Sequence, residues 1–235
     1  MDREAKSTLQ RSGSVAHLII ENPARRNAIT EKMRDDMYLA LDAVVLDESV
    51  RVLVLKGAGT DFSSGADLTE FGRSIDFSLA RTARAMRSIY RKVLSLPKPT
   101  IAAVSGAAIG GGLELALACD IRIAEASSIF GLPEVRRGFI PGGGGTQLLR
   151  QRTLPSGRSD HVLTGEIVGA DQAFRLGWIH EIFQNRKELD CRVVELVNRI
   201  TTENECHIEE VLKTTRSAGV GSALSWPFRL GGSTV

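Results

Sequence analysis

The sequence predicts an α/β fold with mostly parallel strand pairing and a helical C-terminal region. Short runs of β-branched and apolar residues alternate with segments of helical periodicity through the body of the chain. After about residue 142 the pattern becomes largely helical. Apolar residues make up 43% of the 235 residues, so the chain can bury a sizeable core.

The first elements are two strands around one helix. Residues 14–22 (SVAHLIIEN) and 50–57 (VRVLVLKG) have the β-branched and apolar content of strands. A helix is predicted between them after Thr30, which is placed as its N-cap. Four apolar side chains recur on one face of that helix: Met33, Met37, Leu41 and Val44. The second strand leads into a glycine-bearing loop at residues 58–68 (AGTDFSSGADL).

The same alternation continues toward the C-terminus. The predicted elements are a helix across residues 78–96, a strand at 99–106 (PTIAAVSG), a helix after Gly112, a strand at 120–126 (DIRIAEA) and a short apolar segment at 128–133 (SIFGLP). We place a soft boundary near Leu163. It divides an α/β body at residues 1–163 from a helical region at residues 164–235.

Composition argues against several classes of function. Thirty Lys and Arg residues balance 28 Asp and Glu residues, and a net charge of +2 gives no overall preference for nucleic acid or an anionic membrane. Residues 101–119 are nearly all apolar, but four glycines and Glu114 argue against a membrane span. Scattered Cys and His residues predict no metal site. A charged N-terminus without an apolar region predicts a cytoplasmic protein, or a mitochondrial matrix protein whose leader has been removed.

Residues 106–120 (GAAIGGGLELALACD) combine three consecutive glycines with one carboxylate in an apolar helix. The spacing does not fit the nucleotide-binding patterns G-x-G-x-x-G or G-x-x-x-x-G-K-[ST]. The glycines at 110–112 predict either close helix packing or bare backbone whose N–H groups face a negatively charged ligand atom. Glu114 is either a first-turn residue favoured by the helix dipole or a buried carboxylate suited to acid/base chemistry.

A second carboxylate, Glu134, lies in SIFGLPEVRRGFIPGGGGTQ at residues 128–147. This stretch and the one at 106–120 occur in fixed order with IIENPARRNAIT (19–30), DFSSGADL (61–68) and LTGEIVGADQAFRLGWIHEIF (163–183). Together they resemble the crotonase, or enoyl-CoA hydratase/isomerase, family. The resemblance implies a crotonase-like spiral of repeated ββα units that holds the CoA and catalytic site, followed by a helical C-terminal trimerisation region.

The resemblance also implies roles for individual residues. The backbone N–H groups of Ala66 and Gly111 match the two donors of the family's oxyanion hole, which surrounds the thioester oxygen. Glu114 and Glu134 match the two glutamates of the hydratase members. In those members the residue matching Glu134 delivers a proton to C2, and the residue matching Glu114 helps to activate the water that attacks C3. Gly142 resembles the glycine whose N–H holds the second glutamate.

Recognition of CoA is expected in the N-terminal loops. The tandem arginines at 25 and 26 lie in the segment that approaches the nucleotide part of CoA in the family, although a solvated turn would also explain them. The backbone of the loop at 64–68 resembles the adenine and pantetheine pocket, and its aspartate is expected to order the loop itself. The candidate substrate-binding residues are therefore Arg25, Arg26, Ser64, Asp67 and Leu68.

These observations predict an enoyl-CoA hydratase that adds water in the syn sense to a trans-2-enoyl-CoA and gives a 3-hydroxyacyl-CoA. CoA is part of the substrate, and no cofactor or metal is expected. A methylglutaconyl-CoA hydratase, a polyketide-type dehydratase and an enoyl-CoA isomerase are alternatives within the family. An RNA-binding protein is the alternative from another class, against which the near-neutral charge and the lack of an aromatic and basic motif argue.

The expected assembly is a homotrimer or a dimer of trimers. The tail at residues 219–235 is rich in glycine and serine and lacks the helical ending usual in the family. It is predicted to be partly disordered or to dock on a neighbouring subunit through Trp226 and Phe228.

Overall fold

The computed structural model describes residues 5–70, 88–153 and 160–218, and it confirms the α/β fold. The larger of its two sheets has six strands in the order β1-β2-β3-β4-β6-β9, and the smaller has three in the order β5-β7-β8. The strands of the larger sheet are β1 (Lys6–Ser12), β2 (Val15–Glu21), β3 (Val52–Gly57), β4 (Thr100–Val104), β6 (Ile121–Glu125) and β9 (Glu181–Phe183). Those of the smaller sheet are β5 (Ala107–Ile109), β7 (Ile129–Gly131) and β8 (Ile167–Gly169).

Helices connect and cover these strands. The α-helices are α1 (Glu31–Leu46), α3 (Ile89–Leu94), α4 (Gly111–Ala118), α5 (Gly145–Arg152), α6 (Asp160–Thr164), α7 (Ala170–Arg175), α8 (Arg186–Thr202) and α9 (Glu205–Ala218). Three short 3-10 helices are η1 (Pro23–Arg25), η2 (Leu68–Glu70) and η3 (Pro133–Arg137). Across the described ranges, none of the helices is both long and apolar enough to cross a membrane.

Strands β2, β3, β4, β6 and β9 pair in parallel, so the predicted parallel sheet is confirmed. Strands β1, β5, β8 and β9 were not predicted. Strand β1 is an edge strand whose polar sequence KSTLQRS carries no apolar alternation. The other three strands have three residues each, which is too short for a period of two to show.

From β4 to β7, successive strands alternate between the two sheets, and this alternation makes the fold a spiral. Strand β4 joins the larger sheet, β5 joins the smaller one and α4 follows; β6 and β7 repeat the same step. The segment after β3 also crosses over, since Ser63 forms a parallel bridge with Ala108 of β5. The predicted repeat of ββα units is therefore confirmed, and it brings the loop after β3 next to the start of α4.

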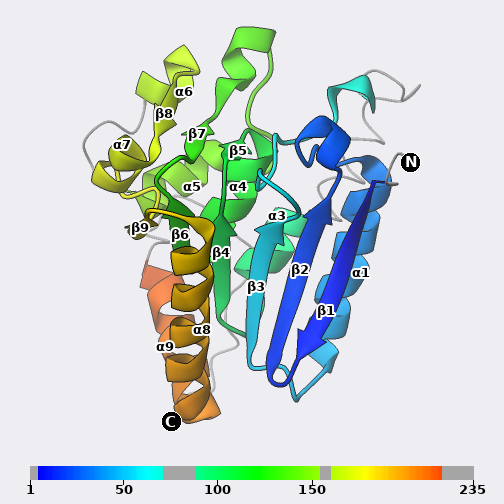
Figure 1. Ribbon diagram of the computed structural model, residues 1–235, viewed down its shortest axis with the longest axis vertical. Coiled ribbons are helices and arrows are strands. Elements are labelled where there is room, and N and C mark those ends of the chain that lie inside the picture. The colour runs from blue at the N-terminus through cyan, green and yellow to red at the C-terminus, as the bar shows by residue number, and fades with distance from the viewer. Residues whose placement is uncertain (1–4, 71–87, 154–159, 219–235) are drawn as a thin grey trace, which may run out of the picture.

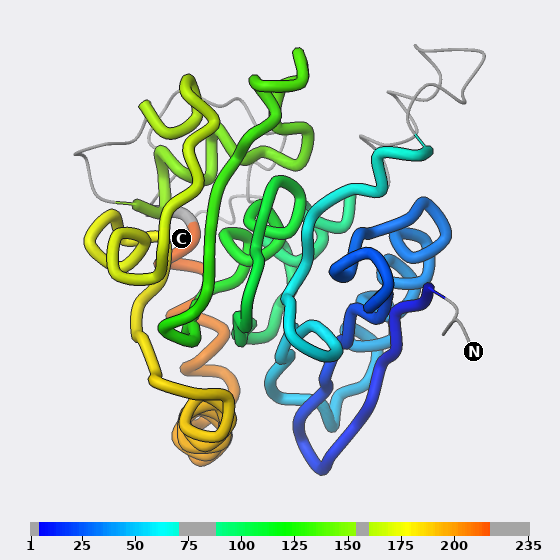
Figure 2. The backbone as a smooth tube through the Cα atoms, turned by 45° about the horizontal axis from the view of Figure 1, so that its top comes forward, coloured from blue at the N-terminus to red at the C-terminus, as the bar shows by residue number. Residues whose placement is uncertain are grey.

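The two faces of the larger sheet are covered by different helices (Figure 1). Leu18 and Ile20 of β2 pack on the side of α1, whose predicted apolar face is fully buried. Val52 and Val54 of β3 pack on the opposite side, in a cluster that includes the buried side chains of α8. Helix α4 lies at the centre of the molecule, between the N-terminal and C-terminal segments (Figure 2). All eight of its residues are buried.

Other predictions have mixed outcomes. Thr30 caps α1 as predicted, because its side chain accepts a hydrogen bond from the N–H of Met33. The predicted boundary near Leu163 lies inside α6, and strands from its C-terminal side complete both sheets, so no break between structural units occurs there. Most of the predicted helix at 78–96, and the tail with Trp226 and Phe228, lie outside the described residues.

Candidate active site

The start of α4 places bare backbone between two neighbouring loops. Gly110 precedes the helix with a φ of 54°, in the left-handed region that favours glycine. A Cβ atom on Gly112 would overlap the carbonyl oxygen of Ser63, so this glycine is required for close packing. A Cβ atom on Gly111 would instead lie 3.5 Å from the backbone nitrogen of Ala66 and 2.6 Å from the hydroxyl oxygen of Tyr90. Gly111 and Gly112 thus pack closely against different neighbours.

The N–H groups of Ala66 and Gly111 face the same space. The N–H of Ile29 donates to the carbonyl of Gly65, and the N–H of Asp67 donates back to the carbonyl of Ile29. Because successive backbone N–H groups of an extended segment point to opposite sides, the N–H of Ala66 is directed away from this bridge and toward α4. Neither it nor the first helical N–H, that of Gly111, donates a hydrogen bond within the described part of the chain. The pair forms a candidate oxyanion hole.

Glu114 is buried one helical turn into α4, with 3% of its surface exposed. Its Oε1 atom accepts hydrogen bonds of 2.8 Å from the backbone N–H groups of both Gly143 and Gly145. Burial and the charge of Glu134 together raise the pKa of Glu114 to about 7, against the two hydrogen bonds, which lower it. The carboxyl group can therefore gain or lose a proton near neutral pH.

Glu134 enters the same site from the first turn of η3, after Pro133. Its Oε2 atom is buried and, among the described residues, has no hydrogen-bond partner. A Cβ atom on Gly110 would lie 2.9 Å from Oε1, so the carboxylate lies against the backbone at the start of α4. Burial raises the pKa of Glu134, while the charge of Arg137 lowers it. An unpartnered buried carboxyl group favours the protonated form.

The contact predicted for Gly142 differs in the structure. The N–H groups that reach a glutamate belong to Gly143 and Gly145, and the glutamate that they hold is Glu114. Gly144 lies between them with a φ of 101°, so the backbone curves and directs both N–H groups at one oxygen. A Cβ atom on Gly142 would meet no atom within 4 Å. The sequence of four consecutive glycines does not indicate which of their N–H groups point at the same carboxylate oxygen.

Tyr90 of α3 is a site residue that sequence reasoning missed. Its hydroxyl oxygen lies at Gly111, and its ring atoms Cδ2 and Cε2 would lie 2.7 Å from a Cβ atom on Gly143. Burial raises the pKa of the Tyr90 hydroxyl, and the charges of Glu114 and Glu134 add to this rise. The available signal was the tyrosine between the apolar residues Ile89 and Val93, because a buried tyrosine usually has a polar partner.

The two arginines predicted to meet CoA are held by aspartates. Arg25 donates to both carboxylate oxygens of Asp67, at 3.0 and 2.8 Å, and Arg26 pairs with Asp61 at 3.0 and 2.9 Å. The arginine side chains remain 53% and 58% exposed, so their charged groups are open to a ligand. Asp67 also accepts from the N–H and hydroxyl of Thr69, and it therefore orders its own loop.

The remaining predicted binding residues lie on the same loop. The hydroxyl of Ser64 donates to the carbonyl of Arg25 at 3.0 Å, which ties the two N-terminal loops together. Leu68 is 46% exposed at the start of η2. Within the ranges that the structure describes, no three or more His, Cys, Asp or Glu side chains are grouped so that they could hold a metal ion.

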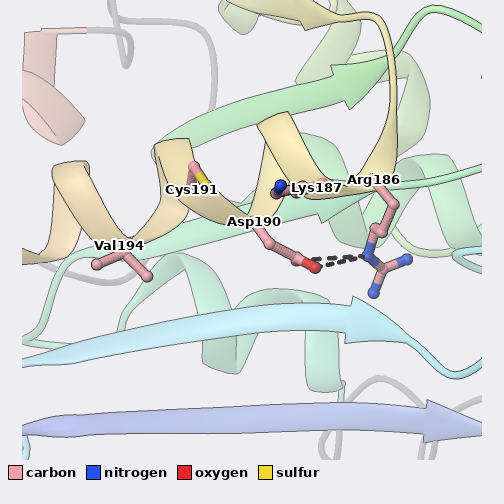
Figure 3. A pocket seen from close by; sticks show the side chains of 5 residues that line it. All are labelled: Arg186, Lys187, Asp190, Cys191 and Val194. Carbon is pink, nitrogen blue, oxygen red and sulfur yellow. Dashed lines mark hydrogen bonds and ion pairs between the residues drawn. The ribbon is translucent and has the colours of Figure 1, made fainter.

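A surface pocket along α8 is separate from these residues. It is lined by Arg186, Lys187, Asp190, Cys191 and Val194 (Figure 3). Within it, Arg186 Nε donates to both oxygens of Asp190 at 3.3 and 3.4 Å. Because α8 and α4 belong to the clusters on opposite faces of the larger sheet, the pocket does not belong to the candidate site.

The site combines two backbone N–H groups, which have no acceptor among the described residues, with two carboxyl groups whose pKa values are raised. Such groups are suited to stabilising negative charge and moving protons. Residues 10–224 match the family described as enoyl-CoA hydratase/isomerase. The chain belongs to this family.

Relatives and solved structures agree with that assignment. Crotonyl-CoA hydratase of Syntrophomonas wolfei is 35% identical over 199 residues, which cover 84% of this chain and 76% of the relative. The 2,3-dehydroadipyl-CoA hydratase of Escherichia coli K12 is 37% identical over 183 residues, covering 77% and 71% of the two chains. The crystal structure of an enoyl-CoA hydratase from Bacillus anthracis superposes with a TM-score of 0.79 at 27% identity, over 92% of this chain and 90% of the other.

Proposed function

We propose that this protein is an enoyl-CoA hydratase, which adds water in the syn sense across the C2=C3 bond of a trans-2-enoyl-CoA and gives a 3-hydroxyacyl-CoA. The observation that carries the proposal is the pair of glutamates with raised pKa values beside two N–H groups that have no acceptor among the described residues. The names of the relatives, which include several hydratases, support the same reaction.

The two N–H groups are assigned to the thioester oxygen. Addition to C3 moves electrons onto that oxygen and forms an enolate, which the N–H groups of Ala66 and Gly111 stabilise. Donors that are already oriented toward such an oxygen contribute roughly 3 to 4 kcal/mol each to the transition state. The same donors would serve any reaction of the family that forms a thioester enolate.

The surroundings of the two carboxyl groups support different roles for them. Glu114 accepts two N–H hydrogen bonds, which favour its ionised form, so it takes a proton from the water as the oxygen bonds to C3. Glu134 has an unpartnered oxygen, which favours its protonated form, so it delivers its proton to C2. In each turnover Glu114 gains one proton from water and Glu134 loses one to C2, so the total charge of the pair does not change. Transfer of a proton from Glu114 to Glu134 then restores the starting protonation states.

Binding and assembly complete the proposal. Arg25 and Arg26 would face the phosphates of CoA while they stay paired with their aspartates, and the backbone of the loop at 64–68 would contact adenine and pantetheine. CoA is the carrier of the acyl group, and the chemistry above needs no cofactor. A homotrimer or a dimer of trimers is the proposed assembly, which light scattering would test.

The hydratase proposal is tested with crotonyl-CoA, by following the loss of ultraviolet absorbance as its conjugated double bond is hydrated. Glu114→Gln and Glu134→Gln should each lower kcat by at least about 10²-fold, the effect typical of lost acid/base assistance. Glu210→Gln, at an exposed position on α9, is the matched control and should leave kcat unchanged. A wild-type protein without hydration activity on short, long and branched enoyl-CoA thioesters would refute the proposal, as would full activity in either glutamate variant.

A further inference from the structure

Three donors lie close together at the start of α4. The position of a Cβ atom on Gly111 is about 2.5 Å from that residue's own nitrogen by covalent geometry. The same position lies 3.5 Å from the nitrogen of Ala66 and 2.6 Å from the hydroxyl oxygen of Tyr90. Because Gly111 has no side chain, the Tyr90 hydroxyl can lie against its backbone. A ligand oxygen held by the two backbone N–H groups would therefore lie close to a phenolic hydroxyl as well.

Among the described residues the Tyr90 hydroxyl has no hydrogen-bond partner, although Tyr90 is partly buried against the main core cluster. Buried tyrosine hydroxyls usually have a partner. The carboxylate of Glu114 does not supply this partner. Its Oε2 atom lies near Gly143, beside the ring atoms Cδ2 and Cε2 of Tyr90 rather than beside the hydroxyl. The hydroxyl, without a partner in the described part of the chain, thus lies beside the candidate oxyanion hole.

We propose that Tyr90 is a further catalytic residue, whose hydroxyl donates a third hydrogen bond to the thioester oxygen as negative charge develops there. The inference rests on the proposed function, because it assigns Tyr90 to the enolate of that reaction. Burial and the two nearby carboxylates raise the pKa of the hydroxyl, so it stays protonated and remains a donor throughout the neutral pH range. No proton is transferred from Tyr90, and the proton balance of the two glutamates is unchanged.

The test is Tyr90→Phe, which keeps the ring and removes only the hydroxyl. Hydration of crotonyl-CoA should show kcat lowered by about 10- to 100-fold, with KM changed by less than about threefold, because the lost bond strengthens only in the transition state. The matched control is Tyr38→Phe, at the only other tyrosine of the chain, whose ring packs under the ammonium group of Lys92 on α3. This control should keep the wild-type kcat.

A binding experiment examines Tyr90 without turnover. Acetoacetyl-CoA carries an acidic C2 and binds an oxyanion hole as its enolate, which absorbs in the near ultraviolet, whereas saturated butyryl-CoA binds as a neutral thioester. Tyr90→Phe should weaken the binding of the enolate at least tenfold and leave the affinity for butyryl-CoA within about threefold. Unchanged enolate binding, or a kcat equal to or above that of the wild type, would overturn the inference. A wild-type protein that fails to hydrate any enoyl-CoA would refute the hydratase proposal alone, because the enolate comparison does not need the two glutamates to act.

Discussion

Removing the charge of Glu114 should stabilise the protein at neutral and alkaline pH while it removes activity. The carboxyl group is almost fully buried, so solvent screens its interactions little. A pKa that rises from 4.5 to about 7 on folding corresponds to about 3 kcal/mol of lost stability once the group is ionised in both states. Glu114→Gln abolishes this loss, and its side-chain oxygen can still accept from the N–H groups of Gly143 and Gly145.

The sign of the effect follows from proton binding. As pH rises, the unfolded chain releases the Glu114 proton near pH 4.5, whereas the folded protein holds it until about pH 7. Between these values the folded state binds more protons, so each increase in pH favours unfolding of the wild type. The variant has no such titration. The difference in the free energy of unfolding, variant minus wild type, should therefore increase by about 2 to 3 kcal/mol between pH 5 and pH 8.

Urea denaturation at pH 5, 6, 7 and 8, at equal protein concentration, would measure this difference. Any fixed cost of the buried amide group shifts all four values equally, so the pH dependence isolates the carboxyl group. Glu210→Gln is again the control and should give a difference that does not change with pH. A flat profile for Glu114→Gln would refute the reasoning, because it would mean that folding leaves the affinity of this carboxyl group for protons unchanged.

Two further predictions concern the glycines. Gly112→Ala should lower the free energy of unfolding by about 1 to 3 kcal/mol in urea denaturation, because its Cβ atom would overlap the Ser63 carbonyl. The control Gly142→Ala should have almost no effect, since its Cβ atom would meet no atom within 4 Å. Equal losses in the two variants would contradict the close packing of Gly112 against Ser63. Gly111→Ala should also destabilise the protein, but less in the Tyr90→Phe background, where the oxygen that its Cβ would meet is absent; strictly additive losses in this double-mutant cycle would show that the two residues do not touch.

Local patterns allowed much of the fold and part of the site to be predicted. Thr30 and the apolar face of α1 follow from residue type and helical spacing, which are properties of neighbouring positions. Glu114 could be predicted as buried because every residue around it is apolar. Tyr90 could not be placed, since its contact with Gly111 joins two helices and leaves no regular spacing in the sequence. The choice among glycines 142 to 145 depends on how one left-handed residue curves the loop, which composition does not encode.

The candidate site uses backbone groups where many enzymes use side chains, and this explains why glycine is concentrated around it. At the start of α4, a missing Cβ on Gly111 lets the Tyr90 hydroxyl lie beside the N–H of Ala66. Cβ atoms on Gly143 and Gly145 would press on the Glu114 carboxylate, so glycine at these two positions lets the N–H groups approach to 2.8 Å. Since any residue except proline supplies an N–H, glycine is needed at these positions for space rather than for the donor. Alanine there should thus impair the site through steric displacement, even though every hydrogen-bond donor remains.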